Sequence, residues 1–482
     1  MHDGDRATAN RGTVLGKLSG GATAFLGLPF AAPPVGDLRW MPPQPVQPTD
    51  DSLDATIHAD RCYQPPYPEI LGDVPSPGAL SEDCLYLNVH TPAVAGKRRP
   101  VMFWIHGGAY LQGSANDFDG SVLAAENDVV VVCINYRLGI FGYLDLSRFG
   151  PAFAGSANLG CQDQIAALRW VKDNIHAFGG DPDNVTVFGE SAGGGSVMAL
   201  LAAPAAEGLF HKAIALSPGP VNYAPHDGIK RLTEFLEIGE DRLLDKLRSM
   251  SGQELSELQL LAGLIPAASV DGEVVTRRTH QAVAEAPGID IPLILGTTKD
   301  EGTLLAPFMD YQAALAVLPR EVVLCEETAE YIESLEGSIG SREEVLEQIV
   351  FDMFRSNVLR VAEHSGDGVW VYRFDVPTIV NDGALGATHG STTPFIFNAY
   401  GAELDMLCKF HDPSDGDVRG LSRSWSAMLA RFARTGDPNG EGWPDWPTHK
   451  TPFRSCLIVD RQLRIETDPD REQRRWYGGL LG

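Results

Sequence analysis

The chain has 482 residues, of which 44% are hydrophobic and 8% aromatic, enough for a large buried core. It holds 38 Lys and Arg against 64 Asp and Glu, a formal net charge of −26. This balance argues against binding to nucleic acid or to an anionic membrane surface, because no basic stretch is present to neutralise phosphates. An acidic surface keeps a protein in solution and mildly favours neutral or cationic substrates over anionic ones.

No segment approaches 18 uninterrupted apolar residues, and the first residues lack the basic and then apolar pattern of a signal peptide. The seven cysteines are widely spaced and contain no C-x-x-C, so they indicate neither a disulfide framework nor a zinc site. We therefore expect a cytoplasmic protein with no metal and no other cofactor; a secreted protein from which a signal peptide was removed is the alternative. Its expected partner is a small-molecule substrate, and both a monomer and a homodimer stay open.

The predicted elements begin with one or two edge strands, followed by an irregular segment rich in Pro and Gly at residues 27–45. Beyond it, short β-branched runs alternate with helical patterns, which is typical of βαβ units and a mainly parallel sheet. The candidate strands are residues 101–105, 129–134, 185–188, 212–216, 291–295 and 369–374. A helix is predicted over residues 163–175, where apolar residues recur at helical spacing.

Two later stretches, residues 228–261 and 341–362, are charged and helical in pattern. We interpret them as helical insertions over the C-terminal edge of the sheet. The expected organisation is therefore one α/β catalytic domain spanning residues 1–482.

The pentapeptide Gly-Glu-Ser-Ala-Gly at residues 189–193 follows the β-branched run 185–188 and precedes a small, apolar segment. A Gly-x-Ser-x-Gly turn between a strand and a helix exposes its serine in a strained conformation at the helix N-terminus. Ser191 is therefore the predicted nucleophile. The alternative is a glycine-rich connection that merely packs closely.

A serine hydroxyl needs a base, a group that orients the base, and donors for the developing oxyanion. The segment His-Gly-Gly-Ala at residues 106–109 follows the strand 101–105 and matches the loop that supplies such donors. We predict that the backbone N–H groups of Gly107, Gly108 and Ala192 form the oxyanion hole.

The acid and the base are expected in the chain order Ser, then Asp or Glu, then His. His389 lies in a glycine-rich loop after the strand 369–374, and it is the predicted base; a surface histidine is the alternative. The acid should follow the strand 291–295. The pattern alone does not separate Asp300 from Glu301.

Several longer motifs accompany these residues: Gly-Leu-Pro-Phe at 27–30, Ser-Glu-Asp-Cys-Leu-Tyr-Leu-Asn-Val at 81–89, Asn-Tyr-Arg-Leu-Gly at 135–139, Phe-Gly-Gly-Asp-Pro at 178–182, Asp-Glu-Gly-Thr at 300–303, and Phe-Ala-Arg-Thr-Gly-Asp-Pro-Asn at 432–439. With them the chain resembles, over nearly its whole length, the type-B carboxylesterase family of para-nitrobenzyl esterases, carbamate hydrolases, carboxylesterases and cholinesterases. The resemblance implies an α/β-hydrolase fold, with a large, mainly parallel central sheet flanked by helices. It also implies a serine esterase acting on small to medium neutral carboxylic esters.

The resemblance assigns site residues that spacing left open. It implies that Glu301 is the acid and His389 the base, and that Ser217 hydrogen-bonds within the triad network. An ordinary serine at a strand end is the alternative for Ser217. Glu190, directly before the nucleophile, is expected beside the triad as a supporting residue.

Two departures concern the catalytic loops. Thr392 stands where family members usually carry a glutamate three residues after the base, which removes a contact near His389. Ala109 stands where many relatives have a third glycine, and we expect the oxyanion hole to survive because alanine still supplies an N–H.

A third departure concerns the segment between Cys62 and Cys84. Cholinesterases bind the choline cation on a tryptophan there, whereas this chain offers only Tyr63 and Tyr67, so choline esters are poor candidate substrates. The resemblance also implies a disulfide between Cys62 and Cys84 in secreted relatives. For this chain both the bonded and the free state stay open.

Two alternative functions remain at this point. A carbamate hydrolase or amidase would use the same triad with a different pocket. A non-catalytic adhesion or binding relative is the other class, although the chain keeps Ser191, Glu301 and His389.

Overall fold

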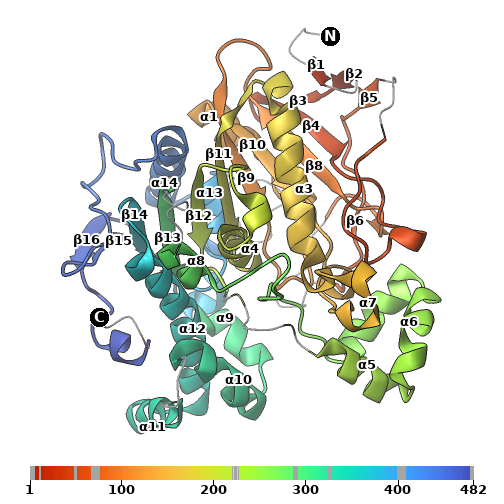
Figure 1. The fold of residues 1–482 in the computed structure, drawn as a ribbon. Coiled ribbons are helices and arrows are strands. Elements are labelled where there is room, and N and C mark those ends of the chain that lie inside the picture. The colour runs from red at the N-terminus through yellow and green to blue at the C-terminus, as the bar shows by residue number, and fades with distance from the viewer. Residues whose placement is uncertain are drawn as a thin grey trace. The chain divides into compact units, whose positions relative to one another are not determined.

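The computed structural model describes residues 6–9, 12–47, 52–66, 76–219, 221, 225, 227–285, 291–323, 328–398 and 409–477 (Figure 1). The chain forms two compact units. The first comprises Met1–His211, Val221–Arg278 and Ala402–Met406, and the second comprises Lys212–Pro220, Thr279–Gly401 and Leu407–Gly482. No helix among the described residues is long and apolar enough to cross a membrane.

The strands of the first unit lie in the order β11-β9-β10-β8-β4-β3. Their bounds are β3 (Lys17–Ser19), β4 (Ala22–Pro29), β8 (Tyr86–Thr91), β9 (Arg99–Ile105), β10 (Val130–Ile134) and β11 (Gly180–Glu190). Strands β11, β9 and β10 are parallel, and β8, β4 and β3 continue antiparallel. Every residue of β9 and β10 is buried, which explains the continuous apolar runs at residues 101–105 and 130–134. The three strands expected in this region are confirmed, each with shifted ends.

Short strands occupy the N-terminal part of the same unit. Strands β1 (Arg6–Ala9), β2 (Gly12–Leu15) and β5 (Leu53–Asp54) form a small separate sheet, and β6 (Arg61–Cys62) pairs with β7 (Leu80–Ser81).

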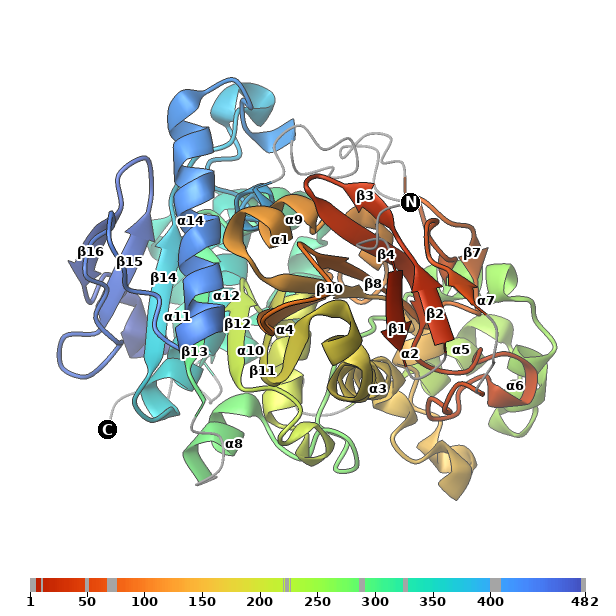
Figure 2. The same ribbon diagram turned by 90° about the horizontal axis from the view of Figure 1, so that it is seen from above.

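Helices cover both faces of the strands of the first unit. Helix α1 (Ser121–Asn127) lies on one side, and α3 (Leu159–Asn174) and α4 (Ala192–Leu201) lie on the other (Figure 2). The expected helix at 163–175 is α3, which begins at Leu159. The short α2 is Gly139–Gly142, and the stretch 228–261 forms three helices, α5 (Gly228–Leu236), α6 (Glu240–Arg248) and α7 (Gly252–Leu261).

The strands of the second unit lie in the order β16-β15-β14-β13-β12. Strands β12 (Lys212–Leu216), β13 (Leu293–Thr298), β14 (Val369–Phe374) and β15 (Ser455–Val459) are parallel, and β16 (Arg464–Thr467) is antiparallel. Two expected strands match β12 and β14. The strand expected at 291–295 instead starts at Leu293, opposite Val369, and continues through two buried threonines to Thr298.

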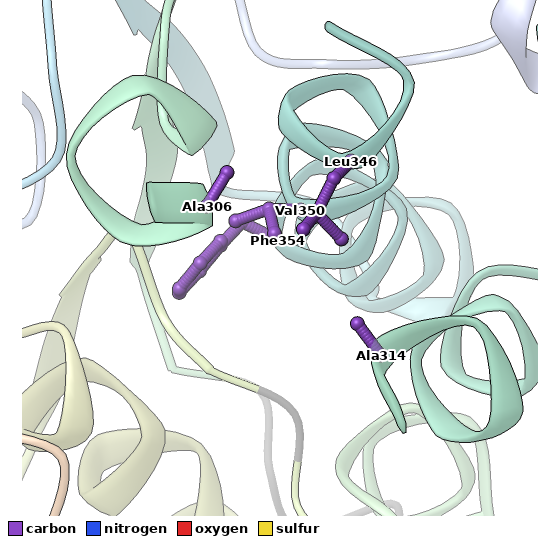
Figure 3. Close-up of a cluster of buried hydrophobic side chains, with 5 residues drawn as sticks. All are labelled: Ala306, Ala314, Leu346, Val350 and Phe354. Carbon is purple, nitrogen blue, oxygen red and sulfur yellow. The ribbon is translucent and has the colours of Figure 1, made fainter. Parts of the chain in front are cut away.

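The helices of the second unit are α8 (Thr279–Glu285), α9 (Gly302–Leu305), α10 (Tyr311–Val323), α11 (Thr328–Ser338), α12 (Arg342–His364), α13 (Thr393–Phe397) and α14 (Gly416–Thr435). Helix α12 packs against β13 and β14, where Arg355 donates a hydrogen bond of 2.9 Å to Tyr372 O. Helix α12 also packs on α9, on the turn that follows α9 and on α10, where a buried apolar cluster is formed by Ala306, Ala314, Leu346, Val350 and Phe354 (Figure 3). The stretch 341–362, which we expected to be an insertion over the C-terminal edge of the sheet, is therefore part of a helix that packs on the strands.

Candidate active site

The turn at Ser191 joins β11 to α4 in the first unit. Ser191 has φ 59° and ψ −122°, a region that costs a non-glycine residue conformational energy. A Cβ on Gly189 would lie 2.5 Å from the carbonyl carbon of Gly193, and a Cβ on Gly193 would lie 2.0 Å from Ile105 O. The two glycines therefore allow the turn to sit directly against the end of β9.

The loop after β9 touches this turn. A Cβ on Gly107 would lie 2.8 Å from Glu190 O and 3.0 Å from Ser191 Cβ, so the main chain of the loop passes beside the serine. Gly108 has φ +105° and Ala109 has φ +54°. The structure thus brings the predicted donor loop and the predicted nucleophile together, and it places Ala109 in a conformation that favours glycine.

Side chains hold both the start of the donor loop, at His106, and the segment that follows it, at Gly113. Gly113 N–H donates to Gln64 Oε1 over 2.8 Å, and Gln64 Nε2 donates back to Gly113 O over 3.0 Å. The His106 ring stacks on Tyr136 at a centroid distance of 4.5 Å, and the Tyr136 hydroxyl donates to His106 O. Burial lowers the pKa of His106 to about 4, so this imidazole is a neutral support and not the base.

The second unit contains a buried acid–base pair. His389 Nδ1 lies 2.5 Å from Glu301 Oε2, and the other carboxylate oxygen accepts a hydrogen bond of 2.7 Å from Thr298 N–H. Glu301 is fully buried and His389 is 6% exposed. With Nδ1 donating to the carboxylate, Nε2 is the ring nitrogen left to accept a proton.

The structure distinguishes the two carboxylates that the sequence pattern could not. Glu301 faces His389, whereas Asp300 Oδ2 accepts a hydrogen bond of 2.8 Å from Ala387 N–H. Of these two carboxylates, Glu301 is therefore the one that is hydrogen-bonded to the predicted base.

Three further predicted residues have distinct surroundings. Glu190 is 6% exposed, and its carboxylate lies beside Gly107, where a Cβ would approach Oε2 to 3.1 Å. The Ser217 and Thr392 hydroxyl oxygens are buried and have no hydrogen-bond partner among the described residues. The participation of Ser217 in a triad network therefore stays a prediction.

Cys62 and Cys84 are both buried free thiols in the structure. A hydrogen bond with Cys62, together with burial, raises the pKa of Cys84 well above its ordinary value. The Tyr63 ring stacks on Phe141, and Tyr67 lies outside the described residues. Within the part of the chain that the structure describes, no three His, Cys, Asp or Glu side chains cluster to hold a metal ion.

Sequence reasoning missed two residues that support the site. The Phe354 ring of α12 lies 4.8 Å from the His389 ring, centroid to centroid, and Gln64 holds Gly113 in the segment that follows the donor loop. Phe354 follows Leu346 and Val350 at helical spacing, a pattern that predicts a buried face but not its neighbour (Figure 3).

The model of the carboxylesterase family matches residues 4–476. The chain belongs to the carboxylesterase family. This carboxylesterase is 39% identical over 495 residues to the para-nitrobenzyl esterase of Bacillus subtilis (strain 168), with 97% of each chain covered. It is 36% identical over 487 residues to human cocaine esterase, covering 91% of this chain and 85% of the relative.

Solved structures agree with this assignment. The carboxylesterase superposes on a thermophilic para-nitrobenzyl esterase with a TM-score of 0.88 at 35% identity, covering 98% of this chain and all (100%) of the other. A carboxylesterase from Geobacillus stearothermophilus gives a TM-score of 0.85 at 34% identity, with 98% and 100% covered. The expected α/β-hydrolase fold and the expected carboxylic ester hydrolase activity are confirmed. The amidase and adhesion alternatives are not favoured.

Proposed function

We propose that the carboxylesterase works by two-step acyl transfer, with Ser191 as nucleophile, His389 as general base and Glu301 as the residue that orients the base. The observation that carries this proposal is the buried hydrogen bond between His389 Nδ1 and Glu301 Oε2. Such a bond holds the imidazole in one tautomer and stabilises the imidazolium that forms during the reaction.

In the first step, His389 takes the proton of Ser191 as Oγ attacks the ester carbonyl, and the alcohol then leaves with that proton. Water hydrolyses the acyl-enzyme by the same route in the second step. The N–H groups of Gly107, Gly108 and Ala192 stabilise the oxyanion in both steps. Each lost donor in a site of this kind costs about 3–4 kcal/mol of transition-state stabilisation.

The proposed substrates are small to medium neutral carboxylic esters. The net charge of −26 disfavours anionic substrates at the surface. Relatives that carry the names para-nitrobenzyl esterase and cocaine esterase support esters over amides. Side-by-side kinetics on an aryl ester and on the matching anilide would measure this preference directly.

The decisive test is covalent labelling with an alkyl fluorophosphonate, using Ser191→Ala as the control. We expect one label per folded wild-type chain, none on the variant, and turnover of the variant lower by about four to six orders of magnitude. Peptide mapping should locate the label on Ser191. Folded wild-type protein that hydrolyses esters without being labelled at this residue would refute the assignment.

A further inference from the structure

We propose that Asp300 is a positioning residue for the base, because its carboxylate ties the loop that carries His389 to the turn that carries Glu301. This inference rests on the proposed function, since it assumes that His389 and Glu301 act as base and acid.

Two hydrogen bonds join Asp300 to Ala387. Asp300 N–H donates to Ala387 O over 3.0 Å, and Ala387 N–H donates back to Asp300 Oδ2 over 2.8 Å. The contact continues as a short parallel bridge between Asp300 and Thr388, directly before His389. Ala387 and Thr388 are 1% and 0% exposed, so this pairing holds a buried part of the base loop, and a buried main-chain N–H needs an acceptor.

Thr303 provides a second connection between the same two segments. Its Oγ1 lies 2.7 Å from Leu385 O, 2.8 Å from Thr388 Oγ1 and 2.8 Å from Asp300 O. A hydroxyl has one proton, so Thr303 can donate to one carbonyl and accept from the Thr388 hydroxyl at the same time. The turn and the loop are therefore joined by side chains as well as by main-chain pairing.

The loop also fits closely around the Asp300 carboxylate. Gly386 has φ +59°, and a Cβ there would lie 2.3 Å from Asp300 Oδ2. No L-side chain can occupy this position without displacing either the carboxylate or the loop. The glycine thus allows the approach that brings Ala387 N–H within hydrogen-bond distance.

The consequence for catalysis follows from the distance between acid and base. Glu301 and His389 are 88 positions apart in the sequence, yet their atoms lie 2.5 Å apart. A misplacement of about 1 Å in a catalytic constellation can lower a rate by about 10²-fold. Without the Asp300 carboxylate, the Ala387 N–H would lose the acceptor that ties it to the acid turn, and we expect the base loop to shift away from Glu301.

The experiment compares Asp300→Ala with Asp300→Asn, which keeps a carbonyl oxygen able to accept from Ala387 N–H. We expect Asp300→Ala to lower kcat on an aryl ester by about 10- to 100-fold, with KM changed far less. The acid limb of its pH–rate profile should move to lower pH, because the imidazolium loses part of its contact with Glu301. The downfield proton resonance of His389 Nδ1–H should weaken or vanish. Asp300→Asn should restore most of kcat and the resonance.

Asp445→Ala is the matched control, since that aspartate is exposed, and it should behave as wild type. Wild-type kcat, pH profile and resonance in Asp300→Ala would overturn the inference. The inference would also be overturned if Asp300→Ala lowered the unfolding midpoint and kcat, left the pH profile unchanged, and was not rescued by Asp300→Asn. Failure of the proposed function gives a different result: Ser191→Ala and Glu301→Gln would both keep wild-type turnover.

Discussion

Asp352 of α12 is a buried carboxylate outside the catalytic site, and its replacement gives a quantitative test of the energetics of the second unit. Its oxygens accept hydrogen bonds of 2.7 Å from Tyr331, 3.0 Å from Tyr477 and 3.0 Å from Gln348. Burial raises the pKa of Asp352 to about 6, and these hydrogen bonds offset only part of that effect. The Asp352→Asn variant keeps the shape of the side chain and removes the charge.

The direction of the effect on stability follows from the direction of the pKa shift of Asp352. Between an ordinary pKa of 3.8 and the folded value of about 6, the native protein keeps a proton that the unfolded chain releases. Stability from this group therefore falls as pH rises through that window, and the loss is complete above pH 6. The rise of the pKa from 3.8 to about 6 corresponds to roughly 3 kcal/mol at neutral pH.

The assay is thermal unfolding of wild type and Asp352→Asn from pH 4 to pH 8. We expect equal midpoints near pH 4 and a higher midpoint for the variant above pH 6, with the gap opening between them. Asp445→Asn, at an exposed position, is the control and should show no gap. A gap that does not change with pH, or a variant less stable than wild type at pH 7, would refute the reasoning.

Three further predictions concern acid, packing and catalysis. Burial lowers the pKa of three histidines to about 4. These are His90, His106 and His411. Between pH 6.5 and pH 4 only the unfolded chain binds protons at these histidines, so the unfolding midpoint of the wild type should fall as the pH is lowered through this range. Calorimetry measures this midpoint, and a midpoint that stays constant would contradict the prediction. Gly193→Ala should slow fluorophosphonate labelling by about 10²-fold or more, because its Cβ would meet Ile105 O, whereas Gly420→Ala, with open space around it, should not. Ester hydrolysis should decline below about pH 6–7, since His389 must be neutral to accept the proton, and a constant rate from pH 5 to 8 would count against its role as base.

Local patterns in the sequence were sufficient for the nucleophile and the donor loop. The turn at Ser191 lies between a β-branched run and a small, apolar segment, and the loop 106–109 directly follows a fully buried strand. In such cases the residues that determine the conformation are neighbours in the chain. The requirement for glycine at 193, by contrast, comes from the close approach of Ile105 O, which lies far away in the chain.

The local pattern left two adjacent candidates for the acid, and only the resemblance to the family selected Glu301, because the geometry of this turn depends on a loop far away in the chain. Asp300 and Glu301 are adjacent, and which of them meets His389 depends on the path of residues 375–389. The contact of Phe354 with the His389 ring likewise depends on tertiary packing of α12. Strands β15 and β16 were not predicted, and β13 extends through two threonines that a search for apolar residues excludes.

The exchange of hydrogen bonds between Gln64 and Gly113 has a consequence for engineering this enzyme. One side-chain amide matches both main-chain groups of Gly113, as a neighbouring strand would, and Gln112 Nε2 donates to Pro65 O and Pro66 O. Substitutions at residues 64–66 should therefore lower turnover even where the protein still folds, because they disturb the segment that follows the donor loop. A mutant library intended to change substrate preference should keep these positions constant and place its diversity elsewhere, so that altered selectivity is not confused with a displaced donor loop.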